Sequence, residues 1–178
     1  MDSYYSNNYE QMDSDWADNS HIVWNARTVI LLIGFIAIPL IVGGISSLLT
    51  RNAMMEFNMM VKPPLAPPAW LFPVVWSVLY VLMGIACFLI YESSDESRYA
   101  GLVLFSMQLV MNFFWSLIFF RLDAYVLAAA WLALMILLIV ALIINTSRYS
   151  IPAMIMLIPY GLWCGFAMYL NVGIAALN

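Results

Sequence analysis

The stretch KPPLAPPAWLFPVVWSVLYVLMGIACFLIY, residues 62–91, decides the fold of this chain. It opens with four prolines between positions 63 and 68, and it continues as an uncharged apolar run from Trp70 to Tyr91. Each proline lacks an N–H and disfavours helical backbone at the residue before it, so the first part predicts a stiff, extended loop. The apolar run has the length of about 20 residues that a helix needs to cross the hydrocarbon core of a bilayer.

The chain contains four more apolar runs of similar length, one before this stretch and three after it. The sequence is 65% hydrophobic and only 9% charged, whereas a soluble domain carries about 25% charged residues. Lipid offers no hydrogen-bond partners to the backbone, so each run must be helical, and the short alternating segments of a barrel are absent. The sequence therefore predicts an all-α integral membrane bundle of five transmembrane helices, at about residues 29–50, 70–91, 99–120, 124–144 and 152–177.

Charge divides the chain into two parts. Residues 1–21 are polar and hold half of the ten acidic residues, which predicts a disordered acidic tail before a membrane domain at residues 22–178. No basic stripe is present, which argues against nucleic-acid binding. The bases in and beside the loops divide three against three between the two sides of the membrane, so positive charge does not predict the orientation.

The third apolar run carries an unusual polar face. Gln108, Asn112, Trp115 and Ser116 fall on one side of a helix. Amide groups are costly in hydrocarbon unless they are paired, so this face is expected to point into the bundle. Two interpretations stay open: the amides link neighbouring helices, or they orient a polar group of a ligand.

Aromatic and small residues share inward faces on the second and fifth runs. Such stripes can be plain helix packing, but three faces of this kind could also enclose a flat apolar ligand with a few polar groups. The expected lining residues are Trp76, Tyr80, Gln108, Asn112, Trp115, Tyr160, Trp163, Ala167 and Asn171. The proline loop is the expected lid over one end, with Lys62, Pro64, Pro67, Pro68 and Trp70 as its residues.

The sequence offers little for catalysis or metal binding. Its one histidine, His21, lies in the tail, both cysteines lie in apolar runs, and no acid lies inside a span. We therefore assign no catalytic residue and no metal site. Any chemistry would have to use tryptophan, tyrosine, cysteine or the ligand itself.

Residues Lys62–Ala86 resemble the signature KPxxxPPxWxFxxxWxxLYxxMGxA of the TspO/MBR family, the tryptophan-rich sensory proteins and translocator proteins. Two further blocks agree with this family, QLVMNFFWSLIFF at Gln108–Phe120 and IPYGLWCGFAMYLN at Ile158–Asn171. Pro39 and Gly43 fit the proline-then-glycine pattern of its first helix. The resemblance covers about 150 residues and leaves only the acidic tail outside.

The resemblance implies a five-helix bundle, often dimeric, that binds porphyrins such as protoporphyrin IX and haem. We expect that the protein requires no cofactor and that a porphyrin or haem is its ligand. By matching position, Trp76 and Trp163 correspond to the tryptophan pair implicated in porphyrin binding and in light-dependent porphyrin breakdown by bacterial members. Gln108 and Asn112 match polar pocket residues, and the loop prolines shape the lid.

These observations together predict a membrane receptor or binding protein for porphyrins and related hydrophobic ligands, with a sensory, stress-regulatory or tetrapyrrole-handling role. Two alternatives remain, a light-dependent porphyrin-degrading enzyme and a transporter of a small hydrophobic metabolite. A structural scaffold without a ligand is the simplest competing interpretation. The expected partners are membrane lipid, a flat hydrophobic ligand and a second copy of the chain, and the expected location is a bacterial cell membrane.

Overall fold

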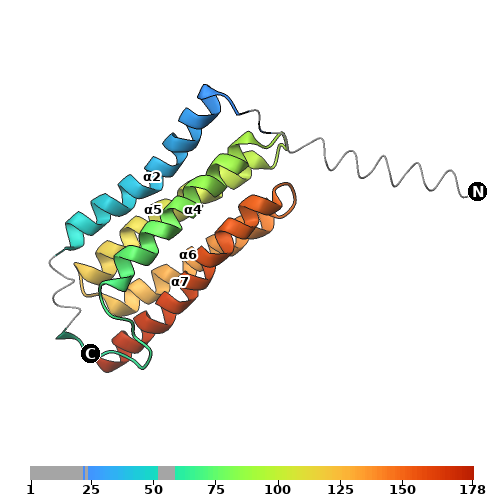
Figure 1. The fold of residues 1–178 in the computed structure, drawn as a ribbon. Helices are drawn as coiled ribbons and strands as arrows, with labels where there is room; N and C mark the ends of the chain where they lie inside the picture. Colours follow the sequence, from blue (N-terminus) through green and yellow to red (C-terminus); the bar gives the residue numbers. More distant parts are fainter. Residues whose placement is uncertain (1–21, 23, 52–58) are drawn as a thin grey trace, which may run out of the picture. The chain divides into compact units, whose positions relative to one another are not determined.

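The computed structural model describes residues 22, 24–51 and 59–178, so the acidic tail at 1–21 lies outside the described residues. The chain divides after Ile30 into two compact units. The described part contains five helices, labelled in Figure 1 as α2 (Ala26–Thr50), α4 (Leu71–Glu92), α5 (Arg98–Phe120), α6 (Tyr125–Thr146) and α7 (Ile151–Leu177).

The described end of the first unit contains the start of α2. Asn25 precedes the helix, and its side-chain Oδ1 accepts hydrogen bonds from the backbone N–H of Thr28 at 3.0 Å and from the Thr28 hydroxyl at 3.2 Å. Asparagine is among the best residues at this position because its side chain satisfies an N–H group that the helix leaves unpaired. The first turn of α2 is therefore fixed by its own sequence.

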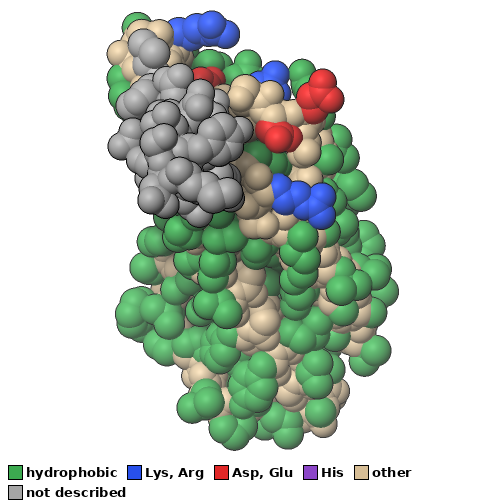
Figure 2. Space-filling model, turned by 90° about the vertical axis from the view of Figure 1, so that its right-hand side faces the viewer, with side chains coloured by type: hydrophobic (Ala, Val, Ile, Leu, Met, Phe, Trp, Pro, Cys, Tyr) green, Lys and Arg blue, Asp and Glu red, His purple; other side chains and the backbone are tan. Residues whose placement is uncertain are grey.

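All five helices are long and apolar enough to cross a membrane, which confirms the predicted five-span, all-α integral membrane protein. Hydrophobic side chains cover most of the flank visible in Figure 2, and charged side chains gather at one end of this face. Large apolar side chains such as Leu162, 72% exposed, point outward along the spans. A bilayer solvates such a surface, whereas water would not.

In the second unit, Leu31–Asn178, four helices form a ring of neighbours. Helix α5 packs against α6, α6 against α7, α7 against α4, and α4 against α5. Their shared core consists of fully buried apolar side chains, among them Met83, Leu132, Met135, Ile139 and Leu157. The ring also contains a hydrogen bond across helices, from the Trp131 Nε1–H to the Met111 carbonyl at 2.9 Å.

Helix α2 contacts α4 through two glycines, one on each helix. A Cβ at Gly84 would collide with the α2 backbone at Ile36, and a Cβ at Gly43 would collide with the ring of Tyr80. Small residues allow this close approach between helices in a membrane. Phe35 adds ring contacts from α2, with its centroid 5.1 Å from that of Tyr91. Shape rather than hydrogen bonding thus holds α2 on α4.

The described part of the proline loop, residues 59–70, docks on the last turns of α7. The Asn178 side chain donates to the Val61 carbonyl at 3.0 Å and accepts from the Val61 N–H at 3.3 Å. The Tyr169 hydroxyl donates to the Pro64 carbonyl at 2.5 Å. A Cβ at Gly173 would lie 2.6 Å from Pro63 Cγ, so the proline ring sits directly on the glycine.

Candidate ligand-binding site

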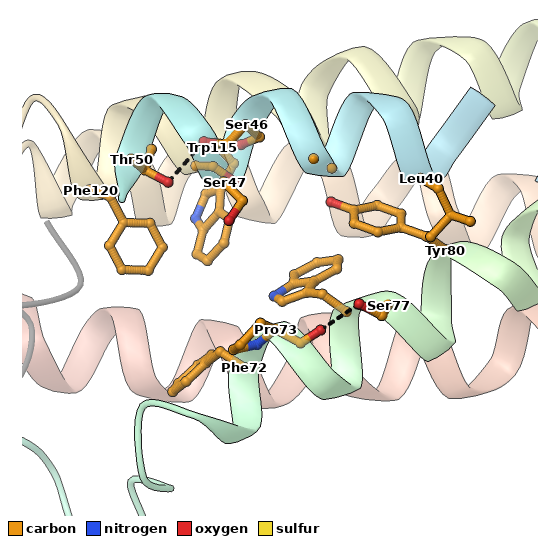
Figure 3. A pocket seen from close by; sticks show the side chains of 14 residues that line it. Leu40, Ser46, Ser47, Thr50, Phe72, Pro73, Ser77, Tyr80, Trp115 and Phe120 are labelled. Carbon is orange, nitrogen blue, oxygen red and sulfur yellow. Dashed lines mark hydrogen bonds between the residues drawn. The ribbon is translucent and has the colours of Figure 1, made fainter. Parts of the chain in front are cut away.

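A cavity of about 250 Å³ lies between α2, α4 and α5 (Figure 3). Figure 3 places Thr50, Phe72 and Phe120 at one end of this cavity and Leu40 and Tyr80 at the other. The first end is the one where α2 and α5 finish and α4 begins, so we call it the loop end. The lining residues are Leu40, Gly43, Gly44, Ser46, Ser47, Thr50, Phe72, Pro73, Trp76, Ser77, Tyr80, Trp115, Ser116 and Phe120.

Aromatic rings form one wall of the cavity, with Trp76 at their centre. The Trp76 ring is stacked on Tyr80, with centroids 5.5 Å apart. It also lies 6.4 Å from the ring of Trp115 and 6.2 Å from that of Tyr160. Contacting rings of this kind present flat, polarisable faces to a planar ligand and keep their own geometry through mutual packing.

Hydroxyl groups line the α2 side of the cavity, and Ser77 adds one from α4. The Thr50 hydroxyl donates to the Ser46 carbonyl at 2.9 Å, and the Ser77 hydroxyl donates to the Pro73 carbonyl at 2.8 Å. Ser and Thr in membrane helices commonly bond in this way to the preceding turn, which leaves the hydroxyl oxygen available as an acceptor. Ser46 is only 4% exposed yet lines the cavity. None of the described lining residues carries a charge.

Behind the aromatic wall, a buried hydrogen-bond network joins three helices. The Tyr80 hydroxyl donates to Asn112 Oδ1 at 2.8 Å, and Asn112 Nδ2 donates to the Tyr160 hydroxyl at 3.3 Å. The Tyr160 hydroxyl donates in turn to Gln108 Oε1 at 2.7 Å. Because Gln108 and Asn112 are buried away from the cavity, the geometry favours their role in linking helices; Tyr80 is the network member that lines the cavity.

The predicted lining residues fall into three groups in the structure. Trp76, Tyr80 and Trp115 line the cavity, while Gln108, Asn112 and Tyr160 lie in the network behind it. The fifth-span residues do not line this cavity but lie next to it: Trp163 packs edge-on against the lining residue Phe72 at 6.0 Å. Ala167 and Asn171 line a small cavity of about 20 Å³ that shares Phe72, Trp115 and Phe120 with the larger one.

Asn171 also helps to hold the aromatic wall in place. Its Oδ1 accepts from the Trp115 Nε1–H at 3.3 Å, and its Nδ2 donates to the Tyr125 carbonyl at 2.8 Å. The amide thereby connects α7 to both α5 and α6. This contact fixes the orientation of the Trp115 indole against the cavity.

Sequence reasoning missed the contribution of α2 and placed the pocket among the second, third and fifth spans. The α2 wall consists of small and hydroxyl-bearing residues that face the rings of α4 across the cavity. The signal in the sequence was the run GGISS at 43–47, which interrupts an otherwise aliphatic span. The expected lid residues Lys62, Pro64, Pro67, Pro68 and Trp70 are not among the residues that line the cavity, and their loop contacts α7 instead.

Comparison with known proteins places the chain in a family. Residues 35–177 match the model of the TspO/MBR family. The chain is 34% identical to the tryptophan-rich protein TspO of Chlorobaculum tepidum, over 85% of this chain and 98% of that protein. It is 31% identical to TspO of Archaeoglobus fulgidus, over 84% and 98%, and 29% identical to the bovine translocator protein, over 78% and 85%. Five apolar spans and these matches agree, and the chain belongs to the TspO/MBR family.

Proposed function

We propose that this protein is a membrane binding protein for porphyrins, such as protoporphyrin IX and haem, and for related flat hydrophobic ligands. In this proposal it serves a sensory, stress-regulatory or tetrapyrrole-handling role. The names of relatives, tryptophan-rich sensory protein in Cereibacter sphaeroides and translocator protein in cattle, are consistent with a ligand-responsive membrane protein.

The observation that carries the proposal is the aromatic wall of the cavity. Trp76 lies against Tyr80 and Trp115, and all three rings line the same space. Mostly apolar pockets with a few orienting polar groups are typical of small-molecule sites. Here the rings supply contact area for a macrocycle, while the hydroxyl groups of α2 supply sparse polar contacts.

The size of the cavity adds a condition to the proposal. Its volume of about 250 Å³ is slightly below the range of about 300–1,000 Å³ that is usual for ligand pockets. A porphyrin would therefore extend through the opening or displace one wall. Helix α2 is the wall suited to move, because it is the least buried of the five helices and meets α4 through glycine contacts.

The test is a titration of the detergent-solubilised protein with protoporphyrin IX, followed by tryptophan fluorescence. We expect saturable quenching, and we expect Trp76→Phe to weaken binding by about tenfold because the central ring of the wall is reduced. The matched control is Trp131→Phe, because Trp131 is an indole of α6 whose Nε1–H bonds to the Met111 carbonyl outside the cavity. The Trp131→Phe variant should bind protoporphyrin IX with the same affinity as the unmodified protein.

Two results would contradict the proposal. Quenching that rises linearly without saturation would show partition into the micelle instead of a site. Equal affinities in the unmodified protein and the Trp76→Phe variant would place any bound porphyrin away from the aromatic wall.

A further inference from the structure

The loop end of the cavity has two positively charged neighbours. Thr50 and Phe120 line this end, and the residues that follow them directly in the chain are Arg51 and Arg121. Both arginines are exposed, and neither forms an ion pair with a described residue. Consecutive Cα atoms lie about 3.8 Å apart, so the backbone of each arginine begins one residue from the lining at this end.

The interior of the cavity has the opposite character. Its described lining is aromatic, aliphatic or hydroxylic, and its far end is formed by Leu40 and Tyr80. A carboxylate placed there would lose its hydration without gaining a cation. An amphiphilic ligand can therefore enter in one sense only, with its apolar edge toward Leu40 and its charged edge toward the loop end.

We propose that Arg51 and Arg121 form an anion-binding rim at the loop end, and that the site takes flat apolar molecules that carry carboxylates along one edge. This inference rests on the proposed function, because the two propionate groups of protoporphyrin IX make it a ligand of this class. Guanidinium groups suit the role because they bind carboxylates through two parallel hydrogen bonds.

Each arginine also has a simpler role available. Basic residues at helix C-termini complement the helix dipole, and they anchor helices at the membrane surface. Those roles affect the protein whether or not a ligand is present, and they do not depend on the charge of the ligand. The rim, by contrast, acts only on ligands that carry an anionic edge, so a neutral analogue separates the two explanations.

The experiment compares protoporphyrin IX with its dimethyl ester, which has the same macrocycle and no carboxylate charge. Both are titrated in a nonionic detergent at low salt against the unmodified protein, Arg51→Gln, Arg121→Gln and the double variant. Exposed ion pairs are worth up to about fivefold each, so the diacid should bind roughly tenfold more tightly than the ester. The double variant should bind the diacid about as weakly as the ester, while its affinity for the ester stays unchanged.

Two control variants and a salt series test whether the charge of Arg51 and Arg121 causes the preference for the diacid. Arg148→Gln removes an exposed arginine between α6 and α7, where neither neighbour in the chain lines the cavity, and should change neither affinity. Arg51→Lys with Arg121→Lys keeps the charge and should retain part of the preference for the diacid. Raising the salt concentration should weaken diacid binding only, because exposed charges are screened.

The outcomes separate this inference from the function on which it rests. Saturable binding of both compounds with equal affinity, or equal losses for both compounds in the double variant, would overturn the anion-binding rim and leave porphyrin binding intact. Absence of saturable binding of either compound would overturn the proposed function and the rim together.

Discussion

The ring of α4, α5, α6 and α7 and the α2 wall are held by different forces. In the ring, buried side chains bond across helices, as Tyr80 does with Asn112 and Asn171 with the Tyr125 carbonyl. Within the described residues, no hydrogen bond joins residues 31–50 of α2 to the ring; Thr50 bonds to its own helix. Glycine contacts and the ring contacts of Phe35 hold α2 instead.

This difference explains where the cavity lies. Polar bonds and dense packing fill the space inside the ring, whereas α2 meets α4 at two glycines and leaves a gap beside Ser46 and Ser47. A wall held by shape alone can shift without leaving buried polar groups unpaired, which would cost about 1–3 kcal/mol each. We therefore expect the ring to be the rigid part of the proposed site and α2 to be its adjustable part.

Breaking the ring should have the largest effect on stability. We expect Asn112→Leu to lower the free energy of unfolding by about 2–3 kcal/mol, because Tyr80 loses its acceptor and Tyr160 loses a donor inside the core. Thermal unfolding in detergent, read by circular dichroism, measures the change.

Ser106→Leu is the matched control on the same helix. Ser106 is exposed, and its hydroxyl bonds only to the Leu102 carbonyl of its own helix. This variant should change the free energy of unfolding by no more than about 0.5 kcal/mol. If the two variants lost the same stability, the network would not be what distinguishes the ring from α2.

A smaller effect is expected where α2 meets the ring. In Gly43→Ala the new methyl group would overlap the Tyr80 ring, which cannot turn aside without losing its bond to Asn112. Helix α2 should shift instead, at a cost of about 1–2 kcal/mol in the same unfolding measurement. In a Tyr80→Phe background, where the ring is free to turn, Gly43→Ala should cost less than it does in the unmodified protein.

The neighbouring glycine should show the smallest effect. Nothing lies within 4 Å of a Cβ built on Gly44, which faces the cavity. Gly44→Ala should leave the free energy of unfolding unchanged or raise it by up to about 1 kcal/mol, because alanine favours helix. A loss in Gly44→Ala equal to that in Gly43→Ala would show that α2 does not meet Tyr80 as described.

Hydropathy predicted the fold well because each span is a property of its own segment. The five predicted helices and the observed ones differ by a turn or less at every end. The inward face of Gln108, Asn112 and Trp115 was likewise visible in one segment, because amides in hydrocarbon must find partners.

The partners of each face could not be read from single segments. Periodicity shows that Trp163 faces inward, but only the packing of α4 against α7 places it behind Phe72, which lines the cavity in its place. In the same way, the prolines predict a stiff loop, whereas its docking depends on Gly173 and Tyr169, more than a hundred residues later. The α2 wall was missed because small residues carry little hydropathy signal.

The most direct test of the central claim is protection of a cysteine placed on the α2 wall. Ser47→Cys puts an exposed thiol on a lining residue, and the native Cys87 and Cys164 are buried. Its labelling by N-ethylmaleimide should slow as protoporphyrin IX is added, with the same concentration dependence as the quenching, while Ser94→Cys in the α4–α5 loop labels at a constant rate. Unchanged labelling of Ser47→Cys at saturating porphyrin would contradict the claim that the ligand occupies the cavity between α2, α4 and α5.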